Sequence, residues 1–527
     1  MKKSIYIFAC ISIIFARTSV FAQAPGIDWK NVYSSYLGSG VCAKPTADGG
    51  YIVGGIFASH FLVFKLDNAG NEQWHRWIIS GTGATQVSSV KQTADNGYIV
   101  AGSDFTGSTD SIGNHGIRDF MITKLDNSGN VAWIKCLGGT SSEEASSIEQ
   151  TPDGGYIVAG YTFSSDGDLA GNTVPWYSEY WIVKLNASGN ITWQKAMGGS
   201  NYDYATSVIP TSDGGYAVAG YSGSKDGNVA GTHWGGSDDD VWVVKLDTSG
   251  SIVWQKSYGG SKEDRAYSIQ QTTDGGYIVA GSTVSNDGNV SGKHGVSHDN
   301  QDYWVIKLDA SGNLTWQKCL GGSGSGIGAG SGNDIAYAVR QTTDGGYVVA
   351  GTVSSGAAVN DDISGYHGST GSDYWVVKLD ASGNIAWQKC LGGNGTEDAR
   401  SIAETPDGGY IIAGTTIYSP DGDVNASDYS NNHPWIVKLG GVTGIQENEG
   451  SLSFAVYPNP VTEYVTVSNL PVGATLRMIN MAGKIVYNAV IQYEQAIINT
   501  SEFSNGMYIV QVVNDGKVVS RKLVVNK

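Results

Sequence analysis

The sequence predicts an all-β chain, a seven-bladed β-propeller closed by an N-terminal strand and followed by a small immunoglobulin-like β-sandwich. A two-part motif recurs seven times, and repeats of about this length with four short strands each are typical of propeller blades. The two ends of the array are out of phase, which predicts the closure. A change of pattern near residue 452 predicts the second domain.

Each repeat has two conserved halves around a variable loop. The first half reads Gly-Gly-Tyr-Ile-Val-Ala-Gly, then the loop, then Tyr-Trp-Ile-Val-Lys-Leu-Asp. The second reads Ser-Gly-Asn, Trp-Gln-Lys, Leu-Gly-Gly and Ala-x-Ser-Ile. Seven first halves end at Lys65, Lys124, Lys184, Lys245, Lys307, Lys378 and Lys438. Seven second halves centre on Trp29, Trp74, Trp133, Trp193, Trp254, Trp316 and Trp387. Apolar and polar residues alternate in short runs, which predicts four strands in each repeat.

The phase of the motif predicts ring closure. The second half that would follow Lys438 is missing there, and an extra second half surrounds Trp29. A first strand that completes the last repeat hides two sheet edges at once. We therefore expect the strand near Trp29 to pair with the strand at 435–439.

Tryptophan and cysteine stand at repeat positions and predict a packed core. Twelve of the fifteen tryptophans occupy two positions of the repeat, and we interpret them as core residues that pack between blades. Cys136, Cys319 and Cys390 share one position, so they lie a whole sheet apart, beyond the roughly 7 Å Cα limit for a disulfide. We interpret them as small buried hydrophobic residues.

The ends of the chain and its charge predict an exported protein. Residues 1–22 read as a signal peptide cleaved after Ala22, and no transmembrane segment follows in the mature chain. We expect a propeller at 23–440, a linker at 441–451 and a separate domain at 452–527. The net charge of −17 argues against nucleic acid as a partner. We expect a monomer.

The last domain resembles the C-terminal sorting domain, type A-like, of proteins exported by the Bacteroidetes type IX secretion system. The resemblance rests on Tyr457-Pro458-Asn459-Pro460, Met481-Ala482-Gly483-Lys484, Asn505-Gly506-Met507-Tyr508-Ile509-Val510 and Lys522-Leu523-Val524-Val525-Asn526-Lys527. It implies that the type IX machinery is a partner through residues 452–527, and that the protein is secreted or held on the outer-membrane surface. The repeats are similar to secreted bacterial propeller repeats, which indicates the fold and leaves function open.

The variable loops carry recurring Asp-Gly sequences that admit two interpretations. A Ca²⁺ site in each loop is one, because hard cations take clustered carboxylate and carbonyl oxygens. Turns in which Asp binds its own backbone are the other. No cofactor is certain, and calcium is the one candidate. Its candidate ligands are Asp166, Asp168, Asp226, Asn228, Asp287, Asn289, Asp421 and Asp423.

A second recurring acid precedes the last strand of five repeats. These residues are Glu143, Asp203, Asp264, Asp334 and Glu397. A carboxylate repeated around a ring pins a turn to backbone N–H groups more readily than it acts as a general acid. An active site needs carboxylates in unequal environments, and the sequence singles out no such pair.

Aromatic residues outside the repeat pattern are the candidate ligand contacts. They are Trp176, Trp234, Tyr366 and Tyr429, and packing within the loops is the alternative. Rings bordered by Asp and Asn suit stacking on sugars. The leading hypothesis is therefore a non-catalytic binding protein for an extracellular glycan or protein on the loop face. The alternative is a polysaccharide-degrading lyase or glycosidase, and a module without a ligand is the third possibility.

Overall fold

The computed structural model describes residues 24–36, 38–57, 60–78, 85–104, 113, 115–169, 177–231, 238–295, 300–322, 332–354, 362–367, 371–417, 419, 421–424, 431–441, 454–480, 484–514 and 517–527. It divides into two compact units, Met1–Gly440 and Gly441–Lys527. Within the described ranges no helix has the length and apolar composition that would span a membrane.

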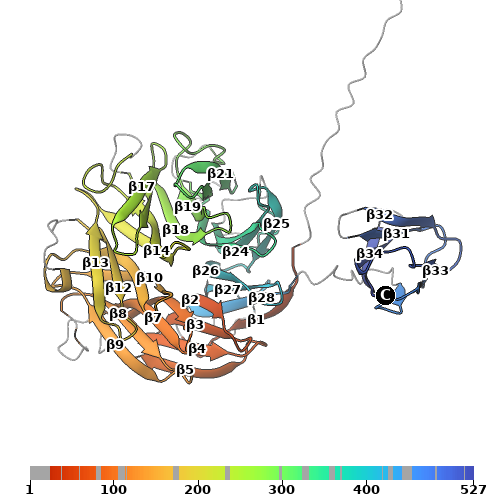
Figure 1. Cartoon of the computed structure of the whole chain (residues 1–527), viewed down its shortest axis with the longest axis horizontal. Coiled ribbons are helices and arrows are strands. Elements are labelled where there is room, and N and C mark those ends of the chain that lie inside the picture. The colour runs from red at the N-terminus through yellow and green to blue at the C-terminus, as the bar shows by residue number, and fades with distance from the viewer. Residues whose placement is uncertain are drawn as a thin grey trace, which may run out of the picture. The chain divides into compact units, whose positions relative to one another are not determined.

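The first unit is built from antiparallel sheets in chain order (Figure 1). Five of its sheets have four strands in the described part of the chain. They are β2 (Gly38–Pro45), β3 (Tyr51–Phe57), β4 (His60–Leu66), β5 (Glu72–Ile78); β6 (Thr85–Gln92), β7 (Tyr98–Asp104), β8 (Asp119–Leu125), β9 (Val131–Leu137); β10 (Glu143–Gln150), β11 (Tyr156–Thr162), β12 (Glu179–Leu185), β13 (Ile191–Met197); β14 (Asp203–Pro210), β15 (Tyr216–Ser222), β16 (Asp240–Leu246), β17 (Ile252–Tyr258); and β18 (Asp264–Gln271), β19 (Tyr277–Thr283), β20 (Asp302–Leu308), β21 (Leu314–Leu320). A short 3₁₀ helix, η1 (Gly167–Leu169), lies in the loop between β11 and β12.

The last two repeats are joined in one eight-stranded sheet. Its strands are β22 (Ile335–Gln341), β23 (Tyr347–Ser354), β24 (Ser372–Leu379), β25 (Ile385–Leu391), β26 (Thr396–Glu404), β27 (Tyr410–Ile417), β28 (His433–Leu439) and β1 (Ile27–Val32). The sequence pattern predicts two separate sheets here. A single parallel bridge between Ser372 and Thr396 connects them.

The first strand completes the last repeat, as the phase of the motif predicts. β1 pairs antiparallel with β28, with Trp29 opposite Lys438 and Val32 opposite Trp435. The predicted pairing is therefore confirmed. The innermost strands β2, β6, β10, β14, β18, β22 and β26 each contact the next, and β26 contacts β2, so these strands surround a central axis.

Tryptophan–tyrosine pairs recur between successive sheets. The tryptophan of each second half meets the tyrosine of the next Asp-Gly-Gly-Tyr or Asp-Asn-Gly-Tyr sequence, with ring centroids 5.6 to 5.9 Å apart. Trp29 of β1 makes the same contact with Tyr51 of β3. Gly70 packs on the face of Trp29 at a φ of 79°, where a Cβ atom would lie 2.8 Å from the ring. The pair that closes the ring thus repeats the contact found between the other sheets.

A buried lysine explains the Lys-Leu-Asp part of the motif. All seven of these lysines are buried, and each places Nζ 2.8 to 2.9 Å from the aspartate of the Asp-Gly-Gly or Asp-Asn-Gly turn. Each also donates to the carbonyl of the leucine that follows it, at 2.9 to 3.1 Å. The one turn with Asn in place of the first Gly, at Asn96, has a φ of 61°, which Asn tolerates. The second Gly, Gly97, cannot change, because its Cβ would collide with the Leu125 carbonyl.

The predicted core residues are buried. Trp181, Trp242, Trp304, Trp375 and Trp435 are at most 2% exposed, whereas most tryptophans of the Trp-Gln-Lys position are partly buried against the cores. Cys136, Cys319 and Cys390 are buried and free, which confirms their interpretation as small hydrophobic residues, and Cys42 is buried and free as well.

The second unit has two antiparallel sheets that share one core. One sheet contains β29 (Ala455–Tyr457), β30 (Tyr464–Ser468) and β33 (Gln495–Asn499); the other contains β32 (Ile485–Val490), β31 (Thr475–Asn480), β34 (Gly506–Asn514) and β35 (Lys517–Val525). Val465 of β30, Met478 of β31 and Val510 of β34 all belong to the shared core. The all-β prediction is confirmed, and an immunoglobulin-like connectivity stays a prediction.

Candidate functional site

The innermost strands turn selected side chains toward the central axis. In β10 the register shifts between Ala145 and Ser147, which leaves Ser146 without a partner residue in β11. The same shift recurs in the other inner strands. Ser146 and Glu149 consequently both line the space at the axis.

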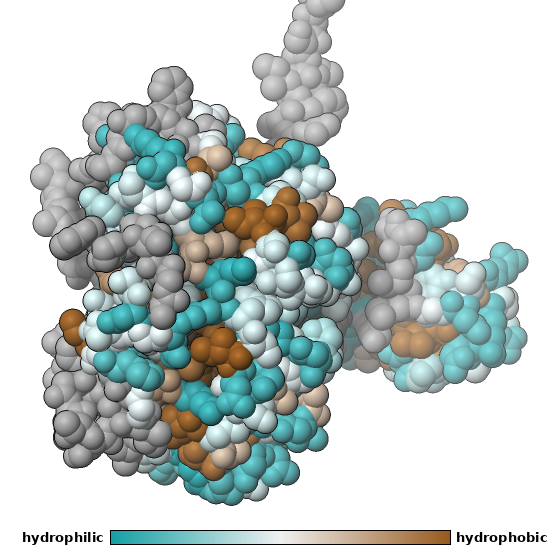
Figure 2. Space-filling model, turned by 60° about the vertical axis from the view of Figure 1, so that its left-hand side comes forward, coloured by the Kyte–Doolittle hydropathy of each residue, from teal (hydrophilic) through white to brown (hydrophobic). Residues whose placement is uncertain are grey.

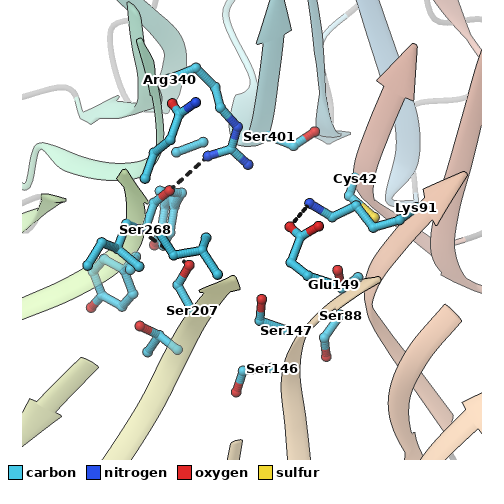
Figure 3. Close-up of a pocket in the computed structure, with 18 of the residues that line it drawn as sticks. Cys42, Ser88, Lys91, Ser146, Ser147, Glu149, Ser207, Ser268, Arg340 and Ser401 are labelled. Atoms are coloured by element: carbon cyan, nitrogen blue, oxygen red, sulfur yellow. Dashed lines mark hydrogen bonds and ion pairs between the residues drawn. The ribbon is translucent and has the colours of Figure 1, made fainter. Parts of the chain in front are cut away.

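This space is a pocket of about 400 Å³ between the inner strands (Figure 3). Hydroxyl groups form much of its wall. They belong to Ser88, Ser89, Ser146, Ser147, Thr206, Ser207, Ser268 and Ser401. Four of these hydroxyls also connect neighbouring strands. The Oγ atoms of Ser207, Ser268 and Ser401 accept hydrogen bonds from backbone N–H groups of the next strand at 2.9 to 3.3 Å, and the Thr206 hydroxyl donates to the Ala266 carbonyl at 2.9 Å. We call this pocket the channel site.

Cations outnumber carboxylates in the channel site. Its lining contains Lys44, Lys91, Arg340 and Arg400 but one carboxylate, that of Glu149. The Glu149 carboxylate is ion-paired with Lys91. In a chain of net charge −17 this local excess of positive charge is opposite to the overall balance. Figure 3 shows Arg340 and the Lys91–Glu149 pair reaching the same space from different sides.

Lys44 and Arg340, the two cations of the channel site without a carboxylate partner among the described residues, have lowered pKa values. Burial lowers the pKa of Lys44 well below its ordinary value, and Arg340 and Lys91 lower it further by repulsion. Burial also lowers the pKa of Arg340. The Arg340 guanidinium donates to the Val339 carbonyl at 2.6 Å and to Ser268 Oγ at 3.3 Å. Within the part of the chain that the structure describes, no carboxylate is paired with either cation.

An aromatic pair forms another part of the wall. The rings of Tyr267 and Tyr337 lie 5.2 Å apart, and the Arg400 guanidinium lies 3.9 Å from the centre of the Tyr337 ring. Burial raises the pKa of both tyrosines, so their hydroxyls keep their protons at neutral pH and can donate hydrogen bonds. Cations, hydroxyls and aromatic rings together suit a polar ligand that carries negative charge.

The buried acids lie at the loop end of the same strands. Glu143, Asp203, Asp264, Asp334 and Glu397 are fully buried. Each accepts a hydrogen bond from a glycine N–H of the preceding Gly-Gly turn at 2.7 to 3.1 Å. The prediction that these acids pin a turn is confirmed. Burial raises the pKa of Asp203 and of Asp264 to about 6 and that of Glu397 to about 7.

The Asp-Gly loops join one repeat to the preceding turn. Asp166 Oδ1 accepts from the Thr140 backbone N–H at 2.8 Å, and Asp226 Oδ1 accepts from that of Ser200 at 2.7 Å. Asp287 and Asp421 make the equivalent bond, while Asp168, Asn228, Asn289 and Asp423 donate their own N–H to a glycine carbonyl of that turn. No three His, Cys, Asp or Glu side chains of the described residues are grouped to hold a metal ion. Calcium binding stays a prediction.

Of the four predicted aromatic contact residues, the structure describes one, Tyr366. Trp176, Trp234 and Tyr429 fall outside the described residues. Tyr366 packs against the core, and its hydroxyl donates to the Gly371 carbonyl at 2.6 Å. On the face drawn in Figure 2, hydrophobic side chains form separate patches bordered by polar residues. Large exposed apolar residues such as Val131 of β9 and Val253 of β17 lie on outer strands.

Sequence reasoning missed the cations of the channel site. Lys44, Lys91 and Arg340 occupy one repeat position, two residues before the threonine that precedes each Asp-Gly-Gly or Asp-Asn-Gly turn. The other repeats place Glu149, Ile209, Gln270 and Ala403 there. A repeat position whose residues differ so much in charge was the available signal, since positions that only hold the ring together repeat the same residue type.

Comparison with known proteins identifies the second unit. Residues 455–526 match the family of secretion system C-terminal sorting domains. The regulatory protein FlaEY of Caulobacter vibrioides is 27% identical over 163 residues, which is 30% of this chain and 17% of that protein. The chain thus spans less than a fifth of the length of that curated relative.

Two solved structures align with much of the chain. The WD40 domain of Neurospora crassa Pan2 aligns with a TM-score of 0.43 and 11% identity, over 79% of this chain and 92% of that one. PorZ of Porphyromonas gingivalis, described as a bacterial surface component of the type IX secretion system, aligns with a TM-score of 0.30 and 11% identity, over 92% of this chain and 74% of that one.

Proposed function

We propose that this protein is a non-catalytic binding protein whose propeller holds an extracellular glycan or protein. Residues 455–526 are a sorting domain of the type IX secretion system, so the protein is exported to the cell surface or the medium. In this proposal the repeats form a seven-bladed ring, in which β26, β27, β28 and β1 make the closing blade.

The channel site carries the proposal. It joins side chains from inner strands throughout the array in one pocket of about 400 Å³. A ligand-binding pocket is concave and presents a few polar groups that fix orientation. Hydroxyls, cations and the Tyr267–Tyr337 pair supply such groups here. The proposal therefore assigns the ligand to the channel, whereas the sequence suggests the loop face.

The same pocket favours binding over hydrolysis. A glycosidase uses two carboxyl groups about 5 to 9 Å apart on either side of the scissile bond. The lining of the channel site has one carboxylate, Glu149, and Lys91 neutralises it. A single paired carboxylate supplies neither the acid nor the base of that reaction.

A glycan array probed with the purified full chain tests the proposal. We expect saturable binding to a restricted set of glycans, lost in Arg340→Gln and kept in Lys135→Gln, a surface change on β9. An arm with EDTA tests calcium. We expect binding to persist with EDTA, because the Asp-Gly loops already bind backbone N–H groups. Loss of binding with EDTA would support the calcium interpretation, and no binding to any glycan or candidate protein would contradict the proposed function.

A further inference from the structure

We propose that the channel site binds an oxyanion, a carboxylate, sulfate or phosphate group, between Lys44, Arg340 and Lys91. This inference rests on the proposed function, because it names the chemistry of the group that the ligand places in the channel. Three observations support the oxyanion site: the positive charge of the lining, the missing carboxylate partners of Lys44 and Arg340, and hydroxyl groups that are free to donate.

The lining of the channel site has an excess of positive charge. Four cationic side chains and one carboxylate line the pocket. Mutual repulsion among Lys44, Arg340 and Lys91 is strongest where water is partly excluded, since a lower dielectric strengthens charge interactions. Lys44 and Arg340 are half-buried, and partial desolvation of a cation without a neighbouring anion costs free energy. An anion from outside supplies the missing partner.

The channel cations differ from the buried lysines of the repeat motif. The seven buried lysines of the repeat motif each have a carboxylate 2.8 to 2.9 Å away. Among the residues described, Lys44 of β2 and Arg340 of β22 have none. Both are half-buried on innermost strands, whereas the seven motif lysines lie on β4, β8, β12, β16, β20, β24 and β28. The seven motif lysines are thus paired with carboxylates, and the two half-buried channel cations are not.

Neutral hydrogen-bond donors also line the channel site. The structure gives no hydrogen-bond partner among the described residues to the hydroxyls of Ser88, Ser146 or Ser147. Figure 3 shows these serines near Lys91 and Glu149, across the space from Arg340. Hydroxyl donors beside cations match an oxyanion, which accepts several hydrogen bonds at once. A guanidinium adds a planar donor set that fits two oxygens of one such group.

Glu149 sets the sign of the decisive test. Its carboxylate already occupies Lys91, so it competes with and repels an incoming anion. Glu149→Gln should strengthen anion binding, whereas Arg340→Gln and Lys44→Met should weaken it by about tenfold each, as expected for a lost hydrogen bond to a charged group. A purely structural role for these residues does not predict opposite effects of the two kinds of change.

The experiment is titration calorimetry of the full chain with sodium sulfate, inorganic phosphate and sodium acetate at constant ionic strength. We expect saturable binding of at least one anion, strengthened by Glu149→Gln and lost in the double variant Lys44→Met with Arg340→Gln. Which salt binds identifies sulfate, phosphate or carboxylate as the group. Thermal unfolding of the variants is the folding control. Because the unpaired cations are costly, we expect the double variant to be at least as stable as the native chain.

The outcomes separate this inference from the proposed function. No saturable binding of any of the three anions to the native chain, or equal binding to the double variant, would overturn the oxyanion site. If glycans or a protein ligand still bind while the anions do not, the proposed function stands alone. If an anion binds as expected and no larger ligand is found, the oxyanion site stands and the proposed function fails.

Discussion

The two ends of the inner strands use charge in opposite ways. At the loop end, buried carboxylates such as Asp203 and Asp264 accept hydrogen bonds from backbone N–H and hydroxyl groups. Farther along the same strands, in the channel site, the side chains differ from repeat to repeat and cations such as Lys44 and Arg340 lack carboxylate partners among the residues described. On these strands the repeated carboxylates have hydrogen-bond partners and belong to the framework, whereas the unrepeated, unpaired charges mark the place we propose for a ligand.

The largest expected effect comes from breaking the framework at its closure. Deleting Ile27–Val32 removes β1, which exposes the edge of β28 and takes away Trp29, the ring partner of Tyr51. We expect the thermal unfolding midpoint to fall by on the order of 10 °C or more. The deletion should cost several kcal/mol, and each kcal/mol lost lowers the midpoint by a few degrees. Differential scanning calorimetry measures it, with Trp29→Phe as a milder control. An unchanged midpoint would contradict closure by β1.

A smaller effect is expected at one loop-end carboxylate. Asp264→Ala leaves the Gly260 N–H and the hydroxyls of Thr283 and Ser285 without their shared acceptor. We expect a loss of about 3 kcal/mol in the free energy of unfolding, measured by urea denaturation. The comparison change in the channel, Ser146→Ala on β10, should cost less than about 1 kcal/mol, because the structure gives the Ser146 hydroxyl no hydrogen-bond partner among the described residues. Equal costs at the two positions would remove the contrast between framework and channel.

The smallest expected effect is a pH dependence set by the same carboxylates. The folded-state pKa values of Asp203 and Asp264, about 6, and of Glu397, about 7, lie above their ordinary values. Folding therefore takes up protons, and the stability that these groups contribute is fully present below their ordinary pKa of about 4 and is lost as the pH rises through 6 to 7.

The turn aspartates oppose this trend in acid. Burial raises the pKa of these carboxyls, but hydrogen bonds and the buried lysines have the larger effect and lower the pKa of Asp153 and Asp213 to about 2. Their contribution is present above pH 4 and is lost as the pH falls toward 2. We expect the unfolding midpoint to be highest near pH 5 and a few degrees lower at pH 8. The profile of Asp264→Asn should be flatter above pH 5, and a native profile that rises steadily to pH 8 would contradict the assignment.

Much of the framework follows from the sequence because its contacts lie within or between adjacent copies of one motif. The partnership of Lys184 with Asp153, the tryptophan–tyrosine contacts and the pairing of β1 with β28 all depend on residue types that recur in phase. The cysteines and the turn-pinning acids could be assigned in the same way. The cation candidates of the loops could not be decided, since an Asp-Gly loop that binds Ca²⁺ and one that binds backbone have the same letters.

The sequence by itself determined the repeat, its strands, the closing strand and the export domain, because each is written in local patterns that short-range physical chemistry interprets. The tertiary structure alone decided which side chains meet at the axis. Lys44, Lys91, Glu149 and Arg340 come from four different inner strands, and no local pattern links them. Ring closure brings them together, and the shared bulge of the inner strands turns them toward one space. Their charges can therefore act on one ligand only after the ring has closed.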